Sequence, residues 1–180
     1  AERREQGVLA GGKVPPNDLG AEASVLGGVL LSNDALDVVV ELLTPEDFYS
    51  EANRHIYRAM VELARDGQPV DLVTLRARLE GAGKLGAVGG DDYLFTLTNT
   101  IPAVANIEAH ARIVREKAVV RGMITACHEI TSQGYADYGS LDQFLDQAEK
   151  SVFDVSKERI RHPYEHVGNV VTRAFEQITA

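Results

Sequence analysis

Two long helical patterns joined by one short turn constrain the fold of this chain more than any other feature. The first pattern begins at Asn106, which is placed to cap it, and continues to about Gly134, roughly 28 residues or ~42 Å of helix. Residues 135–139 are typical of a turn, and Ser140 with Gln143 begins the second helix with a capping box. This pattern predicts an antiparallel helical hairpin over residues 106–160.

Apolar residues recur along both hairpin helices at spacings of four and three, which is typical of a coiled-coil seam. Because so long a hairpin projects from a small globule, we expect its outer face to bind a partner. Spacing does not decide which seam residues face a neighbouring subunit, and a wholly intramolecular core is the alternative. The predicted seam residues are Leu141, Leu145, Ala148, Val152 and Val155 on the second helix and Ile113, Val120, Ile124 and Cys127 on the first.

Residues 17–105 carry shorter helical patterns that predict a small globular helical head. Asp18 is placed to cap a helix over residues 19–31, and proline and glycine then separate the helices that follow. We expect a segment opening at Ser32, a short turn after Thr44, a helix between Ser50 and Gly67, a helix capped by Asp71, and a short helix around Tyr93. The predicted fold class is therefore all-α: a helical head, a long antiparallel hairpin and a C-terminal linker helix.

The two ends of the chain differ from these segments. Residues 1–16 mix glycine, proline and charge without an apolar period, so we expect a flexible leader. Pro163 breaks the second hairpin helix, and residues 161–180 predict a linker followed by an amphipathic linker helix. Little sequence remains to cover the apolar stripe of that helix, which indicates a piece of a larger protein. The stripe includes Val170, Phe175 and Ile178.

The charge balance argues against nucleic acid as the main ligand. The chain carries 18 Lys and Arg against 27 Asp and Glu, a net charge of −9, whereas phosphate binding is driven by basic side chains. No apolar run reaches the ~18 residues that a membrane helix needs, and a single cysteine excludes an internal disulfide. We expect a cytoplasmic protein. A modest basic group on the long helix is either a solvated face or the site of a partner's acidic patch: Arg112, Arg115, Lys117 and Arg121.

Three features resemble catalytic or ligand-binding motifs but lack the required context. The segment 81–86 fits G-x-G-x-x-G, but the dinucleotide motif needs a strand before its glycines, and here a helical pattern ends instead. His162 and His166 are four residues apart, but Pro163 interrupts the helix that would align them on a metal ion. Cys127 has no recognisable base, so we expect it to be a small buried apolar residue. We predict no catalytic, cofactor-binding or metal-binding residues in this chain.

Five segments, in order, resemble the N-terminal part of the bacterial replicative DNA helicase DnaB family over about residues 15–160. They are PPNDLGAEASVLGGVLL from Pro15, PEDFY from Pro45, PVDLVTL from Pro69, GGDDYL from Gly89 and ANIEAHARIVREKAVVR from Ala105. Two positions depart from that family, because Asn53 stands where His is common and His110 stands where Tyr is common. No role of those two side chains is carried over.

This resemblance implies that the function resides in surfaces. In that family, N-terminal domains pair through the hairpin, three such dimers form a collar on a hexameric ring, and the collar binds the C-terminal domain of primase. We therefore expect self-association and primase docking, with a helicase loader as a further candidate partner.

The resemblance also implies that a longer protein carries its ATPase activity in a separate domain. Val170, Phe175 and Ile178 would dock on the ATPase motor of an adjacent subunit, and ATP and magnesium would belong to that motor, which has no counterpart in these residues. The alternative is the helicase-interacting C-terminal domain of a primase, a binding module of related architecture.

Overall fold

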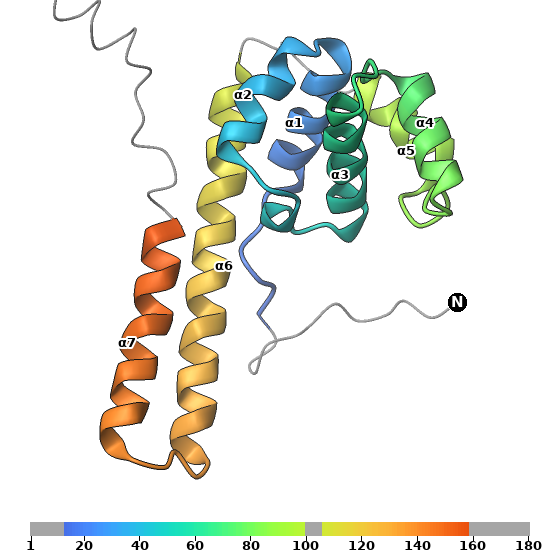
Figure 1. Ribbon diagram of the computed structural model, residues 1–180. Helices are drawn as coiled ribbons and strands as arrows, with labels where there is room; N and C mark the ends of the chain where they lie inside the picture. The colour runs from blue at the N-terminus through green and yellow to red at the C-terminus, as the bar shows by residue number, and fades with distance from the viewer. Residues whose placement is uncertain (1–12, 100–105, 159–180) are drawn as a thin grey trace, which may run out of the picture.

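The computed structural model describes residues 13–99 and 106–158, and within these ranges the chain is helical without a strand. Figure 1 shows helices α1 to α5 gathered into a head, from which α6 continues into a hairpin with α7. The predicted all-α fold class is confirmed. The elements are α1 (Leu19–Leu31), α2 (Asp34–Leu42), the short 3-10 helix η1 (Pro45–Asp47), α3 (Glu51–Arg65), α4 (Leu72–Gly81), α5 (Gly90–Asn99), α6 (Ile107–Tyr135) and α7 (Leu141–Glu158).

Side-chain caps determine where several head helices begin. The Asp18 carboxylate accepts a hydrogen bond from the Ala21 amide at 2.9 Å, and Asp71 accepts two from the first turn of α4, each at 2.9 Å. These bonds satisfy amides that have no partner within the helix. Gly67 ends α3 with a φ of +69°, the left-handed conformation expected of a glycine at that position.

Two predicted helix starts need correction. The segment predicted to open at Ser32 becomes helical only at Asp34, and the preceding Asn33 does not cap it, because its side-chain oxygen accepts from the Val70 amide at 2.7 Å. Asn106 likewise makes no side-chain cap for α6. Its backbone, at φ −116° and ψ 16°, lies outside the extended region that aims a capping side chain at the first turn.

The head core lies between α1, α3 and the start of α6. Gly28 allows close approach of α1 to α6, since a Cβ at that position would lie 2.7 Å from the Cδ1 atom of Ile107. Side chains that are fully buried in this core include Val25, Leu26, Val29, Phe48, Ile56, Tyr57 and Met60.

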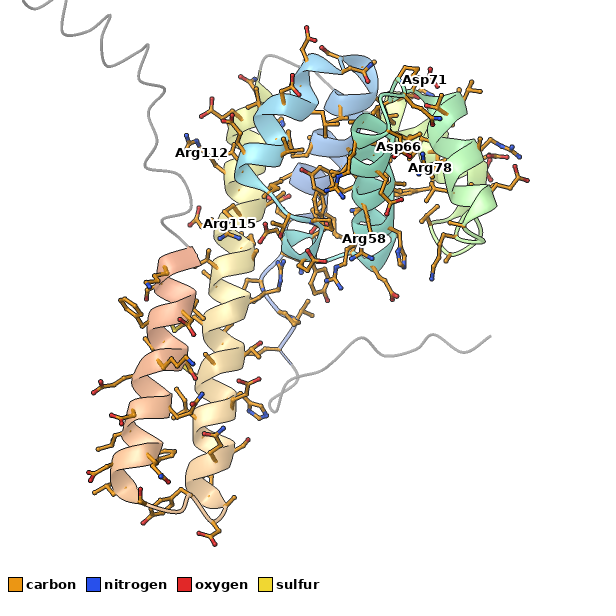
Figure 2. The ribbon with its side chains drawn as sticks, in the orientation of Figure 1. Arg58, Asp66, Asp71, Arg78, Arg112 and Arg115 are labelled. Carbon is orange, nitrogen blue, oxygen red and sulfur yellow. The ribbon has the colours of Figure 1, made fainter. Side chains whose placement is uncertain are left out.

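Ion pairs and buried leucines connect the outer helices of the head to their neighbours. Arg78 of α4 pairs with Asp66, just after α3 (Figure 2). Arg76 of α4 pairs with Asp91 of α5 at 2.8 Å. These side chains are partly exposed, so each pair contributes little to stability. What holds α4 and α5 against the core is burial of Leu75, Leu79, Leu94 and Leu97.

Helix α6 belongs to both the head and the hairpin. Ile107, Ala111 and Val114 in its first turns are buried in the head core, and the helix then continues past the head beside α7 (Figure 1). Among the helices described, none is both long enough and apolar enough to cross a membrane. The domain boundaries predicted from the sequence stay predictions.

Candidate interaction surface

Small residues on α6 and larger ones on α7 form the contact between the two hairpin helices. A Cβ placed at Gly134 would lie 3.5 Å from the ring of Phe144, and one placed at Gly122 would lie 3.6 Å from Val155. Between the two glycines, Ala126 is 6% exposed. The missing side chains let α7 approach the backbone of α6 closely. The half-buried residues of α7 that face this contact are Phe144, Ala148, Ser151 and Val155.

Most of the remaining predicted seam residues lie outside this contact and are exposed. Val120 on α6 is 42% exposed, and Cys127 on the same helix is exposed as well, contrary to the buried role predicted for it. On α7, Leu141 is 59% exposed, Leu145 48% and Val152 38%. We call these five residues the outer face of the hairpin.

The outer-face residues of the two helices lie on the same side of the hairpin. With 3.6 residues per turn, Val120 and Cys127 lie about 100° around α6 from the line of small residues. Leu141, Leu145 and Val152 lie about 70° around α7 from its inner residues. Viewed from the N-terminus to the C-terminus of each helix, this rotation has the same sense as the rotation on α6. Because α6 and α7 are antiparallel, rotations of the same sense bring both stripes to one side. The five residues of the outer face therefore lie on one side of the hairpin and are contributed by two helices.

The other predicted residues have different locations. Ala148 and Val155 belong to the inner contact, Ile113 packs against the head core, and Ile124 is half-buried on α6. The three residues predicted on the linker helix, Val170, Phe175 and Ile178, lie outside the described residues.

The inner contact includes residues absent from the predicted seam, namely Phe144 and the small residues of α6. Their signal in the sequence is a second stripe on α7, offset from the first, at spacings of four, three and four. On α6, Gly122 and Ala126 are four residues apart, and Gly134 follows two such steps later. Small residues at helical spacing thus mark the side on which α7 packs.

The basic residues of α6 have partners within the chain where α6 leaves the head. Arg112 pairs with Glu108 at 2.6 Å, and Arg115, one turn further along α6 (Figure 2), pairs with Asp47 of η1. Arg121 donates to the carbonyl oxygen of Asp47, and burial is the main cause that lowers its pKa. Three of the four basic residues thus have contacts inside the chain, which favours a structural role over an acidic partner.

A buried carboxylate organises the base of the head. Glu22 is 1% exposed and accepts three hydrogen bonds, from the Tyr49 amide at 2.6 Å, the Ser50 amide at 3.3 Å and the Asn53 side chain at 2.8 Å. The Tyr93 hydroxyl donates to the Asn53 side-chain oxygen at 2.6 Å. Burial raises the pKa of the Tyr93 hydroxyl, and the nearby charge of Glu22 adds to this shift. Asn53 thus links α1, α3 and α5, which is a structural role.

The glycine-rich segment 81–86 joins two helices. Gly81 is the last residue of α4, and α5 begins at Gly90, so the strand that a dinucleotide motif requires before its glycines is replaced by a helix. Within residues 13–99 and 106–158, no group of three or more His, Cys, Asp or Glu side chains is placed to hold a metal ion. His162 and His166 lie outside these ranges.

Comparison with known proteins gives consistent results. The family described as "DnaB-like helicase N terminal domain" matches residues 14–116. The replicative DNA helicase DnaB of Geobacillus stearothermophilus is 37% identical over 166 residues, which cover 92% of this chain and 37% of that helicase. The chain thus spans little more than a third of the length of this relative.

Two solved structures share the fold. The N-terminal domain of DnaB helicase from Mycobacterium tuberculosis matches with a TM-score of 0.75 and 42% identity, covering 78% of this chain and 99% of that one. A DnaB-like replicative helicase matches with a TM-score of 0.69 and 24% identity, covering 90% of this chain and 36% of that one. The family match also decides against the alternative of a primase domain. This chain belongs to the DnaB-like helicase N-terminal domain family.

Proposed function

We propose that the outer face of the hairpin pairs two copies of this chain, and that such pairs assemble the N-terminal collar of a hexameric replicative helicase. The observation that carries the proposal is that exposed apolar residues of α6 and α7 lie on one side of the hairpin, where the leucines and valines remain about two-fifths to three-fifths exposed. Exposed apolar surface of this kind marks interaction sites. A two-fold arrangement would bury the same face of both copies against itself.

Sedimentation equilibrium over a wide concentration range tests this proposal. The informative variant carries Leu145→Asp and Val152→Asp, which place two carboxylates within the outer face. Because burying an unpaired carboxylate costs several kcal/mol, we expect the dissociation constant to rise at least ~100-fold while helicity is retained.

A matched control places the same charges on the head. Val73 and Phe95 are 76% and 61% exposed on α4 and α5, so Val73→Asp with Phe95→Asp places two carboxylates at exposed apolar positions of the head and leaves the hairpin untouched. We expect this control to associate like the parent chain. Association that survives the hairpin charges but is abolished by the head charges would contradict the proposal.

Primase docking is a second part of the proposed function. The solved DnaB-like replicative helicase of this fold was described with its interactions with primase, and at 24% identity that likeness shows the fold alone. Membership of the family supports the extension to this chain. Calorimetric titration of the chain with the C-terminal domain of a primase tests it: saturable binding supports docking, and no heat at concentrations where the chain is paired would contradict it.

We also propose that this chain contributes no catalysis of its own. The full-length protein would hydrolyse ATP with magnesium and grip DNA through a motor that lies outside these residues, and the net charge of −9 disfavours direct binding of nucleic acid here. Measurable ATP hydrolysis or DNA binding by residues 1–180 would refute this part.

A further inference from the structure

Where α6 leaves the head, apolar anchoring gives way to polar anchoring. Val114 is the last residue of α6 that is buried in the head core. The next two turns of α6 contact η1 through charged side chains. We call the contacts of Asp47 with Arg115 and Arg121 the junction clamp.

Asp47 makes contacts in three directions from one nearly buried position, since its side chain is 8% exposed. One carboxylate oxygen accepts from the backbone amide of Thr44 at 2.7 Å and from its hydroxyl at 3.1 Å, which fixes the turn of η1. The other carboxylate oxygen pairs with Arg115, whose side chain is 15% exposed. The carbonyl oxygen of Asp47 accepts from Arg121. A single residue therefore holds two separate turns of α6.

Arg121 extends the clamp to the segment before α1. Its second guanidinium nitrogen donates to the Pro16 carbonyl at 2.8 Å, and its guanidinium carbon lies 5.7 Å from the centre of the Tyr49 ring. Arg121 thus bridges two carbonyl groups that are 31 residues apart in sequence, those of Pro16 and Asp47. A planar guanidinium with several fixed donors can make this bridge, whereas a lysine ammonium is a point donor.

We propose that the junction clamp fixes the direction of the hairpin relative to the head. Without it, the apolar anchor of α6 extends from Ile107 to Val114, about 10 Å at 1.5 Å per residue. With it, the anchored length reaches Arg121, about 21 Å. The range of angles open to a rigid rod falls roughly as the inverse of its anchored length. The clamp therefore halves the displacement of the hairpin tip, which lies about 21 Å beyond Arg121 along α6.

The polar character of the clamp makes it a place where the hairpin can be redirected without unfolding the head. When the clamp opens, its charged and carbonyl groups can form hydrogen bonds to water in place of the bonds to each other. Opening the apolar core would instead expose apolar side chains such as Val114 to water, which is unfavourable. A cleft of about 500 Å³ lies between η1 and α6 and is lined by the three clamp residues together with Thr44, Glu46, Ala118, Gly122 and Thr125. This space lets α6 move relative to η1 once the clamp is broken.

Double electron–electron resonance between one label on the head and one at the hairpin tip tests the proposal. Val73 and Tyr135 are 76% and 91% exposed, so Val73→Cys and Tyr135→Cys in a Cys127→Ser chain accept nitroxide labels without disturbing the core. Dilution with excess unlabelled chain leaves at most one labelled copy in nearly every assembly, so that the measured distances lie within one chain.

We expect the distance distribution to become about twice as wide in Arg121→Met and in Asp47→Asn as in the parent chain. Arg112→Met is the matched control, because Arg112 lies on the same helix and, among the described residues, pairs with Glu108 one turn away. Arg121→Lys keeps the positive charge but cannot bridge the two carbonyl groups, so its distance distribution should broaden as well. It provides a second variant if Asp47→Asn does not fold. An unchanged width in the folded clamp variants, or equal broadening in Arg112→Met, would overturn the proposal.

Discussion

Replacing Glu22 by Gln removes one oxygen from the buried network at the base of the head while keeping the shape of the side chain. One carboxylate oxygen accepts from the Tyr49 amide, and the other accepts from the Ser50 amide and the Asn53 side chain. A glutamine keeps at most two of these three bonds, and its NH2 group then faces an N–H donor. The loss is one hydrogen bond to a charged group, and two buried donors, the protein N–H and the new NH2 group, then face each other without an acceptor.

A hydrogen bond to a charged group contributes about 1.5–3 kcal/mol, so we expect Glu22→Gln to lower the free energy of unfolding by about 2–3 kcal/mol. Urea denaturation followed by circular dichroism measures this, with the midpoint shifting at constant slope. Glu51→Gln is the matched control, because Glu51 is 72% exposed and lies 3.7 Å from His55; it should change the free energy by less than about 0.5 kcal/mol. Equal effects of the two substitutions would refute the role assigned to Glu22.

Two further predictions concern caps and close packing. Asp71→Ala removes the cap of α4 and should cost about 1 kcal/mol. Hydrogen bonds, first of all from the Thr74 amide, lower the pKa of Asp71 below its ordinary value of 3.8. The stabilisation by this cap is therefore fully present above pH 3.8 and is lost as the pH falls through the lowered pKa. Carboxyl titration followed by NMR measures that pKa. Gly28→Val should destabilise by about 1–3 kcal/mol, since its Cβ would meet Ile107 at 2.7 Å, whereas Gly81→Ala, with open space around it, should be neutral or stabilising in the same urea titration.

The features of the fold that could be predicted are those encoded within one or two helical turns. Asp18 and Asp71 stand next to the amides they cap, and Gly67 ends α3 through its own backbone freedom. Two predicted helix starts were wrong. The segment expected to open at Ser32 becomes helical only at Asp34, where the Asn33 side chain accepts from an amide 37 residues later in the chain instead of capping the helix. Asn106 has backbone angles that do not aim its side chain at the first turn of α6.

The apolar stripe of the hairpin could be predicted from the sequence, but its division into an inner contact and an exposed outer face could not. Leu141, Leu145, Ala148, Val152 and Val155 fit one broad apolar face of α7, and only the position of α6 decides which half is covered. The glycines of α6 carried that information, because α7 packs where side chains are missing. The networks around Glu22 and Asp47 join residues up to 74 positions apart, so no local pattern could indicate them.

Hydrogen–deuterium exchange of the chain, measured above and below the concentration at which it associates, tests the central claim most directly. If the outer face pairs two copies, protection will rise with concentration in the parts of α6 and α7 that carry Val120, Cys127, Leu145 and Val152, and exchange in α4 and α5 will stay unchanged. Concentration-dependent protection confined to the head, with the hairpin exchanging at one rate throughout, would contradict the account.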